Sequence, residues 1–268
     1  MRSDPSDFRE FEAFAVTLAR AAGEVTLPLF RADIGHDNKA GPGAYDPVTE
    51  ADQAAERAIR ALIGARFPGH GVIGEEYGAD NEEAEFVWVL DPIDGTRAFV
   101  AGLPLWTTLI ALRHRGEPVV GVIAQPYLDE VFVGGPGGSR LLRDGAETPL
   151  QVRACADLGQ AVIATTDAAL FDAAEAPAWD GLRAAARLAR FGCDAYAYAM
   201  LALGRIDLVL ESGLKPWDWE PLVPVIRGAG GRVTGWAGAA PDGSGQVLAA
   251  GDPRAHAAAV ELVRRSAK

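Results

Sequence analysis

The stretch VWVLDPIDGT, residues 87–96, joins a short apolar run to two aspartates and a Gly-Thr pair. The apolar run predicts a buried strand, because a strand covered on both faces carries consecutive apolar residues. Asp91 and Asp94 follow the run, across what the intervening proline predicts to be a turn. Both carboxylates are therefore expected to face one site. Gly95 and Thr96 are expected to begin a short helix whose N–H groups could hold a phosphate.

Two further acidic clusters stand where an apolar segment gives way to a turn. They are GEEYG at residues 74–78 and KPWDWEP at residues 215–221. Carboxylates gathered in one crevice repel each other, and burying them without partners is costly. A hard divalent cation such as Mg²⁺ removes this conflict, and two such ions could clamp the attacking and leaving oxygens of a phosphoryl group. The three clusters together therefore favour metal-assisted phosphate chemistry.

Each acid taken alone also has a structural explanation. Asp52 and Glu220 could be helix-start residues, and Thr49 with Asp52 has the spacing of a capping box, although Asp replaces the preferred Glu or Gln. Other catalytic motifs are missing from the sequence, since neither a Gly-rich nucleotide loop nor a GxSxG serine motif is present.

The regions around these clusters predict two structural parts with a boundary near residue 150. Residues 1–150 are expected to form an α+β part that carries most metal ligands. Residues 151–268 are expected to form an α/β part. Within these parts we expect helices at 8–30, 49–67, 180–190, 194–203 and 221–229, strands at 87–90, 107–112, 119–123, 130–133, 161–165, 206–210, 232–234 and 247–250, and a turn-rich excursion at 134–145.

Composition argues against several classes of partner. The chain has 268 residues with 25 Lys+Arg against 37 Asp+Glu, a formal net charge of −12. This acidity argues against nucleic-acid binding, which depends on Lys and Arg contacts to phosphates. Cys155 and Cys193 lack zinc-site spacing, and no apolar stretch reaches the roughly 18 residues that a membrane span needs. The first residues are polar and acidic, unlike a signal peptide, so we expect a cytoplasmic protein.

The order of the motifs resembles the inositol monophosphatase superfamily. The resemblance rests on DPVTEAD (46–52), GEE (74–76), WVLDPIDGT (88–96), and WD (217–218) with GAGG (228–231). It covers nearly the whole chain. It implies a layered αβαβα fold, hydrolysis of a small phosphate monoester with two or three Mg²⁺ ions per site, and a homodimer.

The resemblance also assigns metal ligands position by position. Glu75, Asp91 and the Ile93 carbonyl would hold one Mg²⁺. Asp91 would bridge to a second ion held by Asp94 and Asp218.

Catalytic and substrate-binding roles follow from the same resemblance. Asp52, Glu75 and Thr96 would be catalytic, with the Thr96 hydroxyl drawing a proton from the attacking water while it is hydrogen-bonded to Asp52. Glu76 would lie behind the metal ligands and orient them. Substrate contacts are implied for Ile93, Asp94, Gly95, Thr96, Asp194, Glu211 and Asp218. The resemblance thus implies that the second part, residues 151–268, carries substrate-facing residues and the last metal ligand.

Three later stretches are more similar to the bacterial histidinol-phosphate phosphatase branch. They are PLWTTLIAL (104–112), GCDAYAY (192–198) and DLVLESGLKPWD (207–218). Histidinol phosphate carries an amine and an imidazole, so Asp194 or Glu211 could pair with its cationic end. The competing interpretation makes Asp194 a cap of the helix that follows.

Other functions stay open at this point. An inositol-1-monophosphatase or a broad small-molecule phosphatase is the alternative enzyme, although Arg97 and Ala98 replace the Thr-Asn of many inositol phosphatases. A regulatory protein-binding member of the fold and a purely structural cation site are the alternatives without catalysis. Lys39 lies in a loop of variable length, so the resemblance gives it no role.

Overall fold

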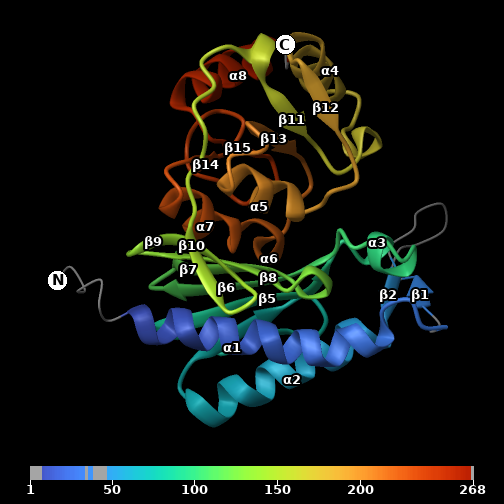
Figure 1. The fold of residues 1–268 in the computed structure, drawn as a ribbon, viewed down its shortest axis with the longest axis vertical. Helices are drawn as coiled ribbons and strands as arrows, with labels where there is room; N and C mark the ends of the chain where they lie inside the picture. Colours follow the sequence, from blue (N-terminus) through green and yellow to red (C-terminus); the bar gives the residue numbers. More distant parts are fainter. Residues whose placement is uncertain (1–7, 34–35, 39–46, 267–268) are drawn as a thin grey trace.

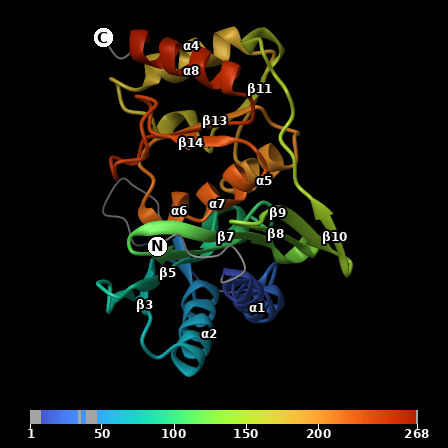
Figure 2. The ribbon, with the colours of Figure 1, turned by 90° about the vertical axis from the view of Figure 1, so that its left-hand side faces the viewer.

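The structure is a computed structural model that describes residues 8–33, 36–38 and 47–266. Lys39 and Asp46 lie outside this range. The described chain forms five layers, which alternate helices, sheet, helices, sheet and helices (Figures 1 and 2). The layered αβαβα fold predicted from the sequence is therefore confirmed.

The larger sheet has eight strands in the order β10-β9-β8-β7-β6-β5-β3-β4. β3 and β5 run parallel, and the other neighbouring strands run antiparallel. The strands are β3 (Gly71–Gly74), β4 (Gly78–Asp80), β5 (Phe86–Asp94), β6 (Thr107–His114), β7 (Glu117–Gln125), β8 (Glu130–Gly135), β9 (Gly138–Arg143) and β10 (Ala146–Pro149).

Helices α1 (Arg9–Thr26) and α2 (Glu50–Arg66) cover one face of this sheet (Figure 2). Both helices place small or branched apolar side chains at three- and four-residue steps, as expected for a helix with one buried face. Ala55, Ile59 and Ile63 of α2 pack with Trp88 and Leu90 of β5 in one buried cluster. The Thr49 capping box closes the start of α2, as predicted. Before it, β2 (Pro47–Thr49) pairs with β1 (His36–Asn38).

The smaller sheet has five strands in the order β12-β11-β13-β15-β14. Its alternating side chains separate two apolar layers, since Val209 and Ala249 pack inward against the middle helices while Leu208 and Leu248 pack outward. The elements of this half are β11 (Val162–Ala164), α4 (Ala176–Ala185), β12 (Leu188–Arg190), α5 (Tyr196–Ala202), β13 (Leu208–Glu211), α7 (Leu222–Gly228), β14 (Arg232–Thr234), β15 (Val247–Ala250) and α8 (Pro253–Ser266).

Helices α5 and α7 form the middle layer that both sheets share. The backbone of α7 approaches the larger sheet closely at two glycines. A Cβ at Gly121 would lie 2.1 Å from the carbonyl oxygen of Pro221, and one at Gly134 would lie 2.5 Å from that of Pro224. Only glycine fits at such distances. The contact fixes α7, and with it the short helix α6 (Pro216–Trp219), on the sheet.

Two predicted segments of the chain were wrong. Residues 134–145 form the end of β8 and all of β9 rather than a turn-rich excursion, because the chain reverses at Pro136–Gly137 and pairs again with β8. Residues 186–190 leave the helix expected at 180–190, since Leu188–Arg190 pair in parallel with β11. The Ala- and Arg-rich sequence there favours a helix, but the ladder with the neighbouring strand decides the structure.

Helix α8 is absent from the sequence-based expectation. Its buried side chains Ala255, Ala259 and Val263 recur every four residues, which is a helical pattern. In the described part of the chain, no helix is both long and apolar enough to cross a membrane.

Candidate active site

Asp91 and Asp94 lie at the end of β5, where the strand carries an extra residue. Asp91 is opposite Leu109 of β6 and Asp94 is opposite Thr107, so β5 advances by one residue more than its partner between these pairs. In a regular strand, residues three apart point to opposite faces, and such a bulge returns them to the same face. The turn predicted at Pro92 is therefore wrong, although the expected convergence of the two aspartates is present.

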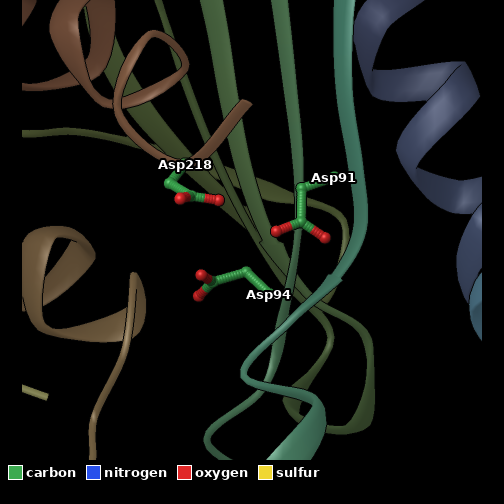
Figure 3. A group of neighbouring side chains, drawn as sticks. All are labelled: Asp91, Asp94 and Asp218. Atoms are coloured by element: carbon green, nitrogen blue, oxygen red, sulfur yellow. The ribbon is translucent and has the colours of Figure 1, made fainter. Parts of the chain in front are cut away.

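Asp218 reaches the same place from α6 in the other half of the fold. Its Oδ2 accepts a hydrogen bond from the Lys215 backbone N–H at 2.7 Å, which fixes the side chain at the helix start. Carboxylate oxygens of Asp91, Asp94 and Asp218 all lie within 4.8 Å of one another. Figure 3 shows the three side chains pointing toward a common centre.

The electrostatics of this cluster suit a cation. Loss of contact with water, with the nearby charges of Glu75 and Asp94, raises the pKa of Asp91 well above its usual range. Burial and the charge of Asp194 do the same to the pKa of Asp94. Three crowded carboxylates, two of which resist ionisation, fit a hard divalent cation, which would offset their mutual repulsion and use all three as ligands.

Glu75 joins the edge of this cluster from the turn between β3 and β4. Its backbone N–H donates to the Leu90 carbonyl oxygen at 3.2 Å, beside Asp91. It contributes to the raised pKa of Asp91 but lies outside the group of three whose oxygens approach within 4.8 Å.

Thr96 and Asp52 are in hydrogen-bond contact, although 44 residues separate them. Thr96 Oγ1 lies 3.2 Å from Asp52 Oδ1 and 3.0 Å from the Ile93 carbonyl oxygen. A hydroxyl has one hydrogen, so it donates to one of these acceptors at a time. Asp52 Oδ2 also accepts from the Thr49 N–H at 2.8 Å and from the Thr49 hydroxyl at 2.6 Å. The capping role and the contact with Thr96 therefore belong to opposite oxygens of one carboxylate.

Asp194 lies over Gly95, which precedes the short helix α3 (Thr96–Val100). A Cβ at Gly95 would be 3.1 Å from Asp194 Cγ, and Gly95 itself has a φ of +81°. Asp194 has a φ of 43°, a left-handed conformation that Asp tolerates better than most residues. Burial raises its pKa to about 6, while the charge of Arg97 opposes the rise.

Asp194 makes no cap for the helix after it. The first residue of α5 is Tyr196, its N-cap is Ala195, and no side chain accepts a capping hydrogen bond there. Instead, the Ala195 N–H donates to Asp94 Oδ2 at 2.7 Å. The helix-cap interpretation of Asp194 is therefore wrong for this structure.

Glu211 is buried at the end of β13. It accepts hydrogen bonds from the Thr165 hydroxyl at 3.1 Å, and from the N–H and hydroxyl of Thr166 at 2.6 and 3.0 Å. Burial raises its pKa to about 8 despite these hydrogen bonds. The charge of Asp194 adds to this rise, so the two predicted substrate-facing acids act on each other electrostatically.

Three features of this region have no counterpart in the sequence-based prediction. The Tyr198 hydroxyl is fully buried without a hydrogen-bond partner, and burial together with the charges of Glu211, Asp94 and Asp218 raises its pKa. Arg113 of β6 makes a bidentate ion pair with buried Glu220, two residues beyond Asp218. Glu56 of α2 contacts the turn that carries Glu75. Of these, Glu56 had a sequence signal, its four-residue spacing from Asp52.

Comparisons with known proteins agree with this geometry. The Inositol monophosphatase family matches residues 7–268. The bifunctional phosphatase IMPL2 of Arabidopsis thaliana, a chloroplast protein, is 42% identical over 267 residues, covering 96% of this chain and 75% of the relative. A histidinol-phosphatase of Mycobacterium tuberculosis is 36% identical over 246 residues, 88% of this chain and 91% of the relative. The structure of an inositol monophosphatase from Zymomonas mobilis superposes with a TM-score of 0.85 at 37% identity, covering 96% of this chain and 98% of that one.

The chain is therefore a phosphatase of the inositol monophosphatase family. Proteins of this family depend on metal ions and act on small phosphate monoesters, which agrees with the acidic cluster of Asp91, Asp94 and Asp218. Overall identity does not distinguish the substrates, because the histidinol-phosphatase and the inositol monophosphatase are 36% and 37% identical to the chain.

Proposed function

We propose that this chain is a Mg²⁺-dependent phosphomonoesterase whose preferred substrate is L-histidinol phosphate. The observation that carries the substrate assignment is the position of Asp194. Its carboxylate adds a negative charge beside Asp94 and Gly95, where a phosphate alone would be repelled. An acid in that position is useful when the far end of the substrate is cationic.

The metal would be held by Asp91, Asp94 and Asp218, together with Glu75 and the Ile93 carbonyl oxygen. These donors are all oxygens, the ligands that Mg²⁺ prefers. The bound ion supplies an acidified water and neutralises charge on the phosphoryl oxygens.

Thr96 and Asp52 would manage the proton of the attacking water. With the Thr96 hydroxyl donating to Asp52 Oδ1, its oxygen lone pairs are free to accept a hydrogen bond from that water. Asp52 is held for this role by Thr49, which fixes the other carboxylate oxygen. The N–H groups of Gly95 and Thr96 would orient the phosphate.

The cationic end of histidinol phosphate would meet Asp194, with Glu211 behind it. Glu211 is held by hydrogen bonds from Thr165 and Thr166, so it offers fixed polar oxygens rather than a mobile partner. The charge-assisted contact is the one feature here that a neutral polyol phosphate cannot use.

Phosphate release from L-histidinol phosphate and inositol 1-phosphate, compared under the same Mg²⁺ concentration, tests the proposal. We expect kcat/KM to favour histidinol phosphate by about 100-fold or more, which corresponds to about 2.7 kcal/mol. The reverse preference would make the chain an inositol monophosphatase. Failure to hydrolyse either substrate while Mg²⁺ still binds would favour a regulatory, protein-binding role.

Asp194→Asn separates charge from shape at the proposed recognition residue. We expect KM for histidinol phosphate to rise about tenfold or more, since a hydrogen bond to a charged group contributes about 1.5–3 kcal/mol, and KM for inositol 1-phosphate to change little. The exposed Asp180 of α4 provides the matched control, Asp180→Asn. Equal changes of KM for both substrates would remove Asp194 from recognition.

We further propose that residues 1–150 carry most metal ligands, that residues 151–268 carry the substrate-facing acids, and that the chain works as a cytoplasmic homodimer. Sedimentation at several protein concentrations would test the dimer.

A further inference from the structure

One face of α2 carries three polar residues at four-residue spacing, namely Asp52, Glu56 and Arg60. Residues four apart lie above one another on a helix. Asp52 contacts Thr96 at the start of α3, and the other two contact the turn between β3 and β4. The same helix therefore touches both loops that carry proposed catalytic residues.

Glu56 is the central member and is fully buried. Its Oε2 accepts the Glu76 backbone N–H at 2.8 Å, and its Oε1 accepts the Tyr77 backbone N–H at 3.2 Å. Two consecutive N–H groups of the turn therefore converge on one carboxylate. Charged acceptors of this kind make stronger hydrogen bonds than neutral ones.

Arg60 completes the contact from the same helix face. Its Nε donates to Glu56 Oε1 at 2.7 Å, and its Nη2 donates to the Gly78 carbonyl oxygen. The pair thus binds both the N–H groups and the far end of the turn. Gly74 makes this approach possible, because a Cβ there would lie 2.0 Å from Glu56 Oε1.

The segment held in this way includes Glu75. Its neighbours on either side, Gly74 and Glu76, both contact Glu56. Its own N–H donates to the carbonyl oxygen of Leu90, the residue before Asp91. Movement of this turn would change the distance between the Glu75 carboxylate and Asp91.

We propose that Glu56, supported by Arg60, is a positioning residue that sets the Glu75 carboxylate against Asp91 for metal binding. The proposal rests on the proposed metal site of the previous subsection. Groups that orient metal ligands from behind typically contribute about 10–100-fold in metal affinity or activity.

Glu56→Gln is the sharpest variant, because it keeps the size of the side chain. A glutamine has one acceptor oxygen where glutamate has two. With that oxygen at the Oε1 position, it still accepts hydrogen bonds from Tyr77 and Arg60. The amide nitrogen then faces the Glu76 N–H, and two donors cannot pair. The hydrogen bond next to Glu75 is thereby lost. We expect the Kd for Mg²⁺, measured by calorimetry on the full chain with the metal alone, to rise about tenfold or more. Activity should recover in part at higher Mg²⁺.

A matched control exists on α8, where Glu261 also pairs with an arginine four residues later. Glu261→Gln should change the Kd for Mg²⁺ less than twofold, since both residues are exposed and far from the site. If Glu56→Gln does not fold, Arg60→Met replaces it, since the Arg60 side chain is 20% exposed. The same direction of change in Mg²⁺ affinity is expected for this second variant.

A lower melting temperature for Glu56→Gln with an unchanged Kd for Mg²⁺ would overturn the inference, because that is the result of a merely structural role. Absence of Mg²⁺ binding to the parent protein would overturn it as well. A parent protein that hydrolyses neither phosphate ester, but whose Mg²⁺ affinity falls in Glu56→Gln, would defeat the proposed function and support the positioning role.

Discussion

Asp91 and Asp252 are both shielded from solvent, at 3% and 5% exposure, yet their pKa values move in opposite directions. Asp252 lies just before α8 beneath the exposed Arg254, whose hydrogen bonds lower its pKa. Asp91 lies deep between the two sheets, where loss of water and neighbouring carboxylates raise its pKa. Depth of burial and the charge of the neighbouring groups together separate this structural acid from the site acid.

The same division runs through the described part of the molecule. Six of the nine buried acids there pair with arginine, a side chain that stays charged and can bind carboxylates through two parallel hydrogen bonds. Asp91 and Glu211 instead accept hydrogen bonds from backbone or threonine groups. The arginine pairs are Glu12–Arg140, Glu56–Arg60, Glu130–Arg143, Asp207–Arg153, Glu220–Arg113 and Asp252–Arg254.

Asp91→Asn should give the largest effect and test the contrast directly. We expect phosphate release to fall about a thousandfold or more, because loss of a bridging ligand removes several kcal/mol of charge stabilisation. Without divalent cations, its unfolding free energy should be unchanged or higher, since a repulsive charge is gone. Asp252→Asn should do the reverse, losing about 1–3 kcal/mol of stability while retaining most activity. Urea denaturation in EDTA and a phosphate assay measure both. A large stability loss in Asp91→Asn would break the comparison.

Arg113→Met tests the arginine pairs. Removing the arginine leaves Glu220 buried without its cation, so the unfolding free energy should fall by about 3–5 kcal/mol. The double variant Arg113→Met/Glu220→Leu should recover much of that loss, because it removes the stranded charge. Denaturation by urea, monitored by tryptophan fluorescence, provides the measurement. A loss below about 1 kcal/mol would class this pair with ordinary surface salt bridges.

The pH dependence of the metal-free protein should carry the opposite sign to that of a salt-bridged acid. Glu211 has its pKa raised from 4.5 to about 8, so between these values the folded state keeps a proton that the unfolded chain has lost. Its contribution to stability is present at low pH and is lost as pH rises through this window. We expect the melting temperature in EDTA to drop by several degrees or more across this window, because a pKa shift of this size corresponds to several kcal/mol. Glu211→Gln should reduce the slope, with Asp194 contributing part of what remains, and Glu261→Gln should leave it unchanged.

The smallest expected effect concerns two tyrosines of one helix. The Tyr198 hydroxyl is buried without a partner, whereas the Tyr196 hydroxyl donates to Glu130 Oε2 at 2.6 Å. Tyr198→Phe should therefore leave the unfolding free energy equal or higher, and Tyr196→Phe should lower it by about 1 kcal/mol. Thermal denaturation of the two variants side by side decides this. Destabilisation by Tyr198→Phe would mean that its hydroxyl has a partner in solution.

The sequence predicted the acids of the site better than their geometry. The convergence of Asp91, Asp94 and Asp218 was predictable because their motifs lie where apolar segments end. That pattern can be read directly from the sequence. The bulge in β5 was not predictable, because it depends on the register of β5 against β6, and Pro92 on its own indicates a turn. The helix expected beyond Ala185 failed for a similar reason, since the ladder with β11 outweighs local preference.

Contacts between segments that are distant along the chain also could not be predicted from the sequence. Arg113 and Glu220 are 107 residues apart, and nothing in either neighbourhood indicates the other. Glu56 is a different case, because its spacing from Asp52 and Arg60 marks a polar stripe directly beside the apolar face that Ala51, Ala55 and Ile59 form. Such a stripe beneath a site motif is a signal that sequence analysis could use.

The close packing of α7 against Gly121 and Gly134 has a consequence for the rate of metal association. The backbone of α7 lies so close to the sheet that only a hydrogen atom fits as the side chain at these two positions, which leaves the helix little room to slide. Asp218 therefore has a fixed position before any ion binds. The ion then binds to ligands that are already in position, so it has to lose bound water but does not depend on a domain closure. Association should consequently be limited by dehydration of Mg²⁺, with a rate nearly independent of solvent viscosity.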